Sequence, residues 1–240
     1  MLDLAVVMPV YNEEDCIVTV IDSWLFVLAG LNIKFKILVL NDGSKDGTDK
    51  RLKVFSNNEQ VVVINKNNSG HGPTILIGYK QAVQIASWVF QCDSDNEIDA
   101  KYFSCLWQKR ESFDALFGIR KDRKQNISRK IISCFAHMTV SCLFGNRISD
   151  VNIPYRLMRA VILQQIIAHI PDDAFAPNVI ISGMFSRSQT RIYEHDVICE
   201  GRKTGVVSVV KWKLWHSAFK SFWQILSCCK NNQQNTVNSG

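Results

Sequence analysis

Four short and mostly apolar runs predict buried strands in the first part of the chain. They cover residues 4–10, 36–40, 61–64 and 88–92. A strand with one buried face would alternate between apolar and polar residues, so continuous apolar runs indicate strands that are covered on both faces.

Segments with helical spacing lie between these runs. Apolar residues from 18 to 28 recur at helical spacing and stop at Gly30. Asn12 is expected to cap this helix, with the acids at 13–15 favouring the helix dipole. A second helix is expected from residue 74 to about 86, with Pro73 at its first position. Alternating strands and helices predict an α/β fold, a mainly parallel sheet with helices on its faces.

Polar residues follow each of the four predicted strands. They form clusters at 11–15, 41–48, 65–72 and 93–97. Ligands of parallel α/β sheets gather at the carboxyl ends of the strands, so these clusters predict a single site. The sequence has no P-loop, no G-x-G-x-x-G and no G-x-S-x-G motif, which argues against the corresponding nucleotide and hydrolase sites. His71 lies in the third cluster, where it is interpreted either as a substrate contact or as a solvated loop residue.

Three acids stand at alternate positions after the fourth run, namely Asp93, Asp95 and Glu97. They would point the same way if the strand continued, and they would then repel one another unless a cation lay between them. Such hard oxygen ligands suit Mg²⁺ or Mn²⁺, which usually also bind substrate phosphates. The alternative is an acidic turn that only ends the strand.

Composition is that of a folded chain of 240 residues, with 47% hydrophobic and 21% charged residues. The eight cysteines have no C-x-x-C or zinc-like spacing, so we interpret them as buried thiols in a reducing compartment. The first residues lack a basic segment, and no apolar run reaches the ~18 residues needed to span a bilayer. We therefore expect a cytoplasmic protein.

The net charge of +6 is unevenly distributed. Basic residues cluster at 120–130, and residues 201–240 contain six basic residues and no acid. This pattern suggests an anionic partner: nucleic acid, a phosphorylated substrate or a membrane surface. Residues 206–228 combine lysine with tryptophan and phenylalanine, and predict an amphipathic helix that lies at a membrane interface or docks on the sheet. Residues 229–240 are expected to be a disordered tail.

Four motifs together resemble those of family 2 glycosyltransferases with the GT-A fold. They are V-M-P-V-Y-N-E-E (7–14), L-N-D-G-S-K-D-G-T (40–48), N-S-G-H-G (68–72) and D-S-D (93–95). The resemblance covers roughly residues 4–205 and implies a single GT-A-type nucleotide-sugar-binding domain, which we expect at residues 1–205. Asn41 departs from the family pattern by replacing the first acid of D-D-G-S, and Glu97 departs from it by occupying the glutamine position of D-x-D-x-Q.

The second half resembles the polyisoprenyl-phosphate sugar transferases of the dolichyl-phosphate mannose synthase type. The matching segments are 117–120, 128–133, 150–156 and 202–205. The resemblance implies a nucleotide-sugar donor, Mg²⁺ or Mn²⁺, and a lipid phosphate as acceptor.

Individual roles are carried over from the family by motif position. The nucleoside of the donor would be held by Pro9, Tyr11, Glu13 and Asp42. The metal, and through it the donor diphosphate, would be bound by Asp93, Asp95 and Glu97, with Asp93 also counted as a donor-binding residue. The phosphate of the acceptor, or the leaving diphosphate, would be faced by Arg120, Arg129, Ser133 and Arg202.

The acceptor decides whether the reaction needs a base. A lipid phosphate monoester is an anion at neutral pH and can attack without one, whereas a sugar hydroxyl requires a carboxylate within hydrogen-bond reach. Asp150 is the candidate base, together with Arg120, Arg129 and Arg202 as the other catalytic candidates. The alternative for Asp150 is a structural acid that caps a helix or pairs with Arg156.

Four functions are therefore compared. The first is metal-dependent, inverting transfer to a polyprenyl phosphate by an enzyme peripheral to the inner face of the membrane. The second is transfer to a hydroxyl of a lipid-linked or surface-polysaccharide precursor. A nucleic-acid-binding module would leave the three acids unexplained, and an inactive scaffold is disfavoured by Asp93, Asp95 and Glu13. Nucleic acid is accordingly not expected as a partner, and the sequence leaves the oligomeric state open.

Overall fold

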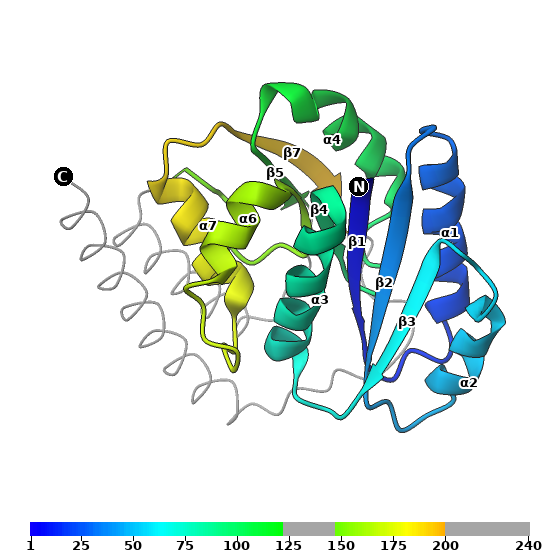
Figure 1. The fold of residues 1–240 in the computed structure, drawn as a ribbon. Helices are drawn as coiled ribbons and strands as arrows, with labels where there is room; N and C mark the ends of the chain where they lie inside the picture. The colour runs from blue at the N-terminus through cyan, green and yellow to red at the C-terminus, as the bar shows by residue number, and fades with distance from the viewer. Residues whose placement is uncertain (122–146, 200–240) are drawn as a thin grey trace.

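The computed structural model describes residues 1–121 and 147–199 (Figure 1). In these residues the strands form one sheet with the order β3-β2-β1-β4-β6-β5-β7. The strands are β1 (Leu2–Val10), β2 (Phe35–Asp42), β3 (Val61–Lys66), β4 (Ala86–Cys92), β5 (Ala115–Lys121), β6 (Tyr155–Arg159) and β7 (Ile192–Ile198). Neighbours are parallel except that β6 runs antiparallel to both β4 and β5. The prediction of a mainly parallel α/β sheet is confirmed.

Helices cover both faces of this sheet. The α-helices among the described residues are α1 (Ile17–Ala29), α2 (Thr48–Leu52), α3 (His71–Ile85), α4 (Phe103–Lys109), α6 (Ala160–Ile167) and α7 (Pro177–Arg187). Short 3₁₀ turns are η1 (Lys53–Phe55), η2 (Ala100–Tyr102) and η3 (Arg110–Ser112). In Figure 1, α3, α6 and α7 lie on one face and α1 on the other.

The central strand β1 shows why the apolar runs fold in this way. Its residues from Leu4 to Val10 are all buried, since side chains on both faces meet a helix layer. On one face, Val7 packs so closely against α3 that a Cβ on Gly78 would lie 2.4 Å from it. On the other face, Trp24 of α1 packs against Phe90 of β4, with 5.1 Å between the ring centroids. Burial of each large apolar side chain contributes about 1.5–3 kcal/mol, which stabilises this three-layer arrangement.

Two predicted helix starts differ from the structure. The first helix begins at Ile17 rather than next to Asn12, and no acid lies in its first turn. Asn12 has a positive φ of 55°, and its side-chain oxygen accepts the Lys45 N–H at 2.8 Å instead of capping a helix. The second helix begins at His71, so Pro73 is its third residue, and it ends at Ile85 because the next residue already belongs to β4.

The fourth strand does not continue through the three acids, which was the condition for their side chains to point the same way. It stops at Cys92, and Asn96 has a φ of 56°, in the left-handed region. Asp93, Asp95 and Glu97 therefore lie in a turn, and their shared orientation does not follow from strand geometry.

Three predicted segments lie outside the described residues, namely most of the basic cluster at 120–130, the interfacial or docking helix at 206–228 and the tail at 229–240. Among the helices that the structure does describe, none combines the length and the apolar character needed to cross a membrane.

Candidate functional site

The loops after β1 and β2 are joined into one unit at the carboxyl edge of the sheet, at the bottom of Figure 1. The Asn12 N–H donates to Ser44 Oγ at 3.0 Å, and the Glu13 N–H donates to Thr48 Oγ1 at 2.8 Å. In return, the Gly47 N–H donates to Glu14 Oε2 at 2.6 Å. The segment that was expected to start a helix thus serves to hold the second loop in place.

Asn41 links the second strand to the third. Its amide nitrogen donates to Asn65 Oδ1 at 2.9 Å, and its amide oxygen accepts the Ser44 hydroxyl at 2.6 Å. An ionised aspartate has no N–H to donate, so the usual acid of the family motif could not make this bond to the Asn65 oxygen. The amide at position 41 therefore suits a polar pair between the ends of β2 and β3.

Asp42 holds the Gly-rich loop. Its carboxylate accepts the N–H groups of Ser69 at 2.8 Å and Gly70 at 2.9 Å, and it pairs with the ammonium group of Lys66. Only 5% of its side chain is exposed. The sequence did not single out Lys66, although a lysine at the end of a buried strand next to an acidic turn is a signal for such a pair. In this structure Asp42 is directed at the loop, and its predicted contact with the nucleoside stays a prediction.

Gly72 brings the Gly-rich loop against the segment before α7. A Cβ at this position would lie 2.2 Å from the Ala174 carbonyl oxygen and 2.5 Å from that of Phe175. Both neighbours are backbone atoms, which cannot rotate away as a flexible side chain could. Only a residue without a side chain allows this close approach.

Replacing Gly72 with alanine is expected to destabilise the protein by roughly 1–3 kcal/mol, because the backbone at Ala174 must move. Nucleotide affinity should fall in parallel if this loop contacts the donor. Thermal unfolding and calorimetry with UDP and GDP would measure both. Gly30→Ala is the matched control, since its Cβ would meet Val27 O at an ordinary 3.5 Å. Unchanged stability of Gly72→Ala would contradict the packing described.

The acids after β4 form an electrostatically strained group. Among the residues that the structure describes, none forms a hydrogen bond with the buried Oδ1 atom of Asp93, although 30% of the side chain is exposed. Burial raises the pKa of Asp93 well above its usual value, and the negative charges of Asp95 and Glu97 add to this effect. The positive charges of Arg120 and Arg156 oppose it. A cation beside Asp93 would relieve this repulsion, so the donor set fits a divalent metal ion.

The three acids do not form a complete metal cage. Glu97 Oε2 accepts the Cys199 thiol at 3.4 Å, and the Asp95 carboxylate accepts the Glu97 N–H at 3.1 Å. Within residues 1–121 and 147–199, no three His, Cys, Asp or Glu side chains are grouped closely enough to hold a metal ion by themselves. An incomplete set of protein ligands is usual for Mg²⁺, which is commonly bound by one or two carboxylates together with substrate phosphates.

His71 stands beside these acids. Its Nε2 lies 3.9 Å from Asp93 Oδ1, and 57% of its side chain is exposed. As the first residue of α3, it is located between the Gly-rich loop and the end of β4. The ring is solvated, as the second interpretation expected, and it lies next to the candidate donor site; a contact of His71 with substrate stays a prediction.

Arg120 and Asp150 form a bidentate ion pair. Arg120 donates from Nε to Asp150 Oδ2 at 2.6 Å and from Nη2 to Oδ1 at 2.8 Å. Their side chains are 9% and 17% exposed. Burial alone would lower the pKa of Arg120, but the hydrogen bond and charge of Asp150 outweigh it and raise that pKa. The partner of Asp150 is therefore Arg120, thirty positions away, rather than the Arg156 that the sequence suggested.

The remaining predicted residues are placed as follows. Pro9 is buried near the end of β1, and Tyr11 is half-buried in the loop that follows. Glu13 is 7% exposed and accepts the Cys16 thiol at 3.3 Å. Arg129, Ser133 and Arg202 lie outside the described residues.

Comparison with protein families gives a match over most of the chain. The model of glycosyl transferase family 2 matches residues 5–170. An uncharacterised glycosyltransferase of Synechocystis is 27% identical over 225 residues, which are 90% of this chain and 67% of that protein. The undecaprenyl-phosphate 4-deoxy-4-formamido-L-arabinose transferase of Yersinia pestis is 23% identical over 80% of this chain. The chain spans 59% of the length of that second relative.

Solved structures with the same fold include glucosyl-3-phosphoglycerate synthase from Mycobacterium tuberculosis. Its complex with Mn²⁺, UDP and phosphoglyceric acid has a TM-score of 0.70 and 16% identity, and the match covers 95% of this chain and 78% of that one. For its complex with Mn²⁺, UDP-glucose and phosphoglyceric acid the TM-score is 0.71, and the match covers 95% of this chain and 80% of the synthase chain. At this level of identity the similarity establishes a shared fold.

Proposed function

The chain belongs to glycosyl transferase family 2, and we propose that it transfers a sugar from a nucleotide-sugar donor to a polyprenyl phosphate. The reaction would be metal-dependent and would invert the anomeric carbon. Support for the acceptor comes from the relative named for undecaprenyl phosphate and from the arrangement of Arg120 and Asp150.

The ion pair of Arg120 with Asp150 is the observation that carries the proposal. Both carboxylate oxygens of Asp150 accept from the guanidinium group, so this acid is arranged to orient an arginine. A hydroxyl acceptor would need a carboxylate aimed at its proton, whereas a phosphate acceptor needs a positioned cation. A guanidinium group held at a fixed angle binds phosphate oxygens in a directed way, which a lysine does not.

The donor would be held at the acidic turn. Asp93 and Asp95 would bind a divalent metal ion, which when present neutralises charge on the donor diphosphate. The bond between the anomeric carbon and the diphosphate oxygen breaks, and its electron pair leaves with the nucleoside diphosphate. An oxygen of the lipid phosphate forms the new bond from the opposite face, and no proton needs to be moved. Arg120 would stabilise the phosphate charge during this exchange.

The proposed acceptor also indicates where in the cell the enzyme would work. A polyprenyl phosphate is a membrane lipid, so the enzyme would work at the membrane surface, and we place it as a peripheral protein on the inner face. The net charge of +6 would favour contact with anionic headgroups.

A panel of nucleotide-sugars tests the proposal directly. Nucleoside diphosphate release is measured with Mn²⁺ or Mg²⁺, with and without polyprenyl phosphate. We expect release to depend on both the metal ion and the lipid phosphate for at least one donor. Release that depends only on a glycan hydroxyl acceptor would contradict the proposal.

Replacing Asp150 with asparagine separates the two acceptor classes. On a phosphate acceptor the variant should lose about tenfold or less, because the amide oxygen still accepts one of the two hydrogen bonds from Arg120. On a hydroxyl acceptor the loss of a general base should lower the rate by about 10²- to 10⁴-fold. Steady-state rates with polyprenyl phosphate and with a lipid-linked glycan would distinguish these outcomes.

A further inference from the structure

Arg156 is a buried arginine in the middle of the sheet. It lies on β6 between Gln91 of β4 and Phe117 of β5, and it has no exposed surface. No carboxylate oxygen lies within 4.0 Å of its nitrogen atoms among the described residues. Burying an arginine without a paired acid is costly, so a specific use of its donors is expected.

The guanidinium group of Arg156 is saturated with hydrogen bonds to two neighbouring segments. Nε and Nη2 donate to the Ile153 carbonyl oxygen at 2.9 and 2.6 Å, and Nη2 also donates to the Val151 carbonyl oxygen at 3.3 Å. Nη1 donates to Asn178 O at 3.0 Å and to Ser182 Oγ at 3.3 Å, both on α7. These five bonds match the five N–H donors of an arginine.

The first of these segments is the turn that carries Asp150. The Ile153 N–H donates back to the Asp150 carbonyl oxygen at 3.3 Å, which closes the turn 150–153. Two carbonyl oxygens of this turn are held by Arg156, and that of Val151 also accepts the Ser182 hydroxyl at 2.8 Å. These hydrogen bonds attach the turn to Arg156 of β6 and to Ser182 of α7.

We infer that Arg156 is a positioning residue, which holds the turn 150–153 so that Asp150 sets the direction of the Arg120 guanidinium group toward the acceptor phosphate. This inference rests on the proposed function for the role of Arg120. The chain of contacts runs from Arg156 through two carbonyl oxygens to Asp150, and from its two carboxylate oxygens to Arg120.

The shape of the side chain explains why arginine suits this position. A planar fork with five donors reaches both the turn and α7, whereas a lysine has a single nitrogen with three donors. Arg156→Lys keeps the charge and removes the simultaneous contact with the two segments. It should therefore loosen the turn without removing the cation.

A spectroscopic test reads the orientation of Arg120 independently of activity. In the full chain with ¹⁵N-labelled arginine, the Nε–H signal of Arg120 is assigned by its loss in Arg120→Lys. We expect its hydrogen exchange to be about tenfold faster or more in Arg156→Lys, because the bond to Asp150 is no longer held. Unchanged exchange in a folded Arg156→Lys protein would overturn the inference.

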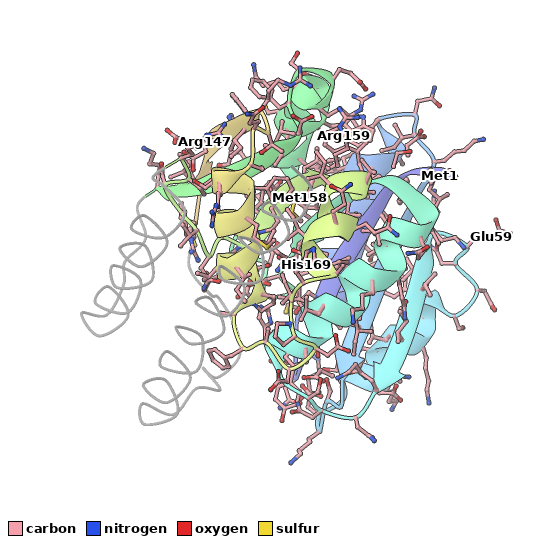
Figure 2. The ribbon with its side chains drawn as sticks, turned by 60° about the vertical axis from the view of Figure 1, so that its left-hand side comes forward. Met1, Glu59, Arg147, Met158, Arg159 and His169 are labelled. Carbon is pink, nitrogen blue, oxygen red and sulfur yellow. The ribbon has the colours of Figure 1, made fainter. Side chains whose placement is uncertain are left out.

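Arg159→Lys is the matched control. Arg159 is on the same strand, stacks on Trp88 with 4.6 Å from its Cζ to the ring centroid, and pairs with Asp114. Figure 2 labels Arg159 and Met1 in the upper part of the view, and Arg159 is the last residue of β6, opposite Trp88 near the start of β4. Arg120 exchange should be unchanged in this variant. If Arg156→Lys does not fold, Ser182→Ala loosens the same turn more gently and should accelerate the exchange to a smaller extent.

Kinetics on double variants separate positioning from general destabilisation. Arg156→Lys should lower the rate with polyprenyl phosphate about tenfold or more, but by less than about twofold when Asp150→Ala is already present. Losses that multiply in the double variant would show that Arg156 does not act through Asp150, and would overturn the inference. A wild-type protein that is inactive on polyprenyl phosphate would instead refute the proposed function, and the exchange measurement would still decide the role of Arg156.

Discussion

Replacing Asp93 with asparagine is expected to lower the rate of sugar transfer by about 10²- to 10³-fold, as is typical when a preorganised electrostatic contact is lost. The same variant should unfold at a temperature equal to or above that of the wild type. Burial, together with Asp95 and Glu97, raises the pKa of Asp93, so the folded state binds a proton more tightly than the unfolded state. The stability that Asp93 contributes is therefore lost as the pH rises through its raised pKa. Asparagine stays neutral at every pH, so the variant does not lose stability in this way at neutral pH.

Asp114→Asn is the control, because the pKa of Asp114 is shifted in the opposite direction to that of Asp93. Burial alone would raise the pKa of Asp114, but the hydrogen bonds and charge of Arg191, with the charge of Arg159, lower it. Its stabilising effect is present at neutral pH and is lost as the pH falls through the lowered pKa. Asp114→Asn should thus lower the melting temperature at pH 7 and retain transfer activity. Full activity in Asp93→Asn, or a marked loss of its stability, would contradict the role given to Asp93.

Arg120→Lys is expected to lower the rate with polyprenyl phosphate by roughly 10- to 150-fold, which corresponds to the loss of one charge-assisted hydrogen bond of 1.5–3 kcal/mol. Lysine keeps the positive charge but has a single nitrogen, so it cannot bind both Asp150 oxygens from two nitrogens while a third nitrogen faces a phosphate. The loss should appear with the acceptor, while the affinity for the nucleoside diphosphate changes little.

Lys121→Met provides the comparison at the neighbouring position. The Lys121 side chain is 54% exposed and lies 3.4 Å from Asp196, so its loss removes a surface ion pair of small value. Its kinetic constants should match those of the wild type. An equal loss in both variants would point to general charge attraction of the lipid and would contradict a directed contact by Arg120.

The first half of the fold could be predicted because β1, β2 and β4 are buried on both faces, and the edge strand β3 is an apolar run that is still half-buried. The runs at β1 to β4 are apolar enough to be recognised without knowledge of their neighbours. The start of α1 could not be predicted, because the bonds of Asn12 and Glu13 to the second loop compete with a helix cap. β5, β6 and β7 were not predicted individually, since β6 is short and inserted antiparallel between two strands.

In the site, too, residues next to the predicted strands could be identified from the sequence, whereas contacts between distant segments could not. The residues at the strand ends could be identified, because the carboxyl edge of a parallel sheet gathers them. The pair of Arg120 with Asp150, and the turn held by Arg156, depend on packing of β5, β6 and α7. The role of Asp42 in holding the Gly-rich loop likewise depends on where β3 ends.

Calorimetric titration of the wild-type protein with UDP and GDP, in Mn²⁺ and in a chelator, tests the central role of the acidic turn most directly. At least one nucleotide should bind about tenfold more tightly or better with Mn²⁺, since each 1.4 kcal/mol gained from metal-bridged phosphates is a factor of ten. This gain should disappear in Asp93→Asn. Equal affinity with and without the metal ion, or a gain that Asp93→Asn retains, would contradict the account.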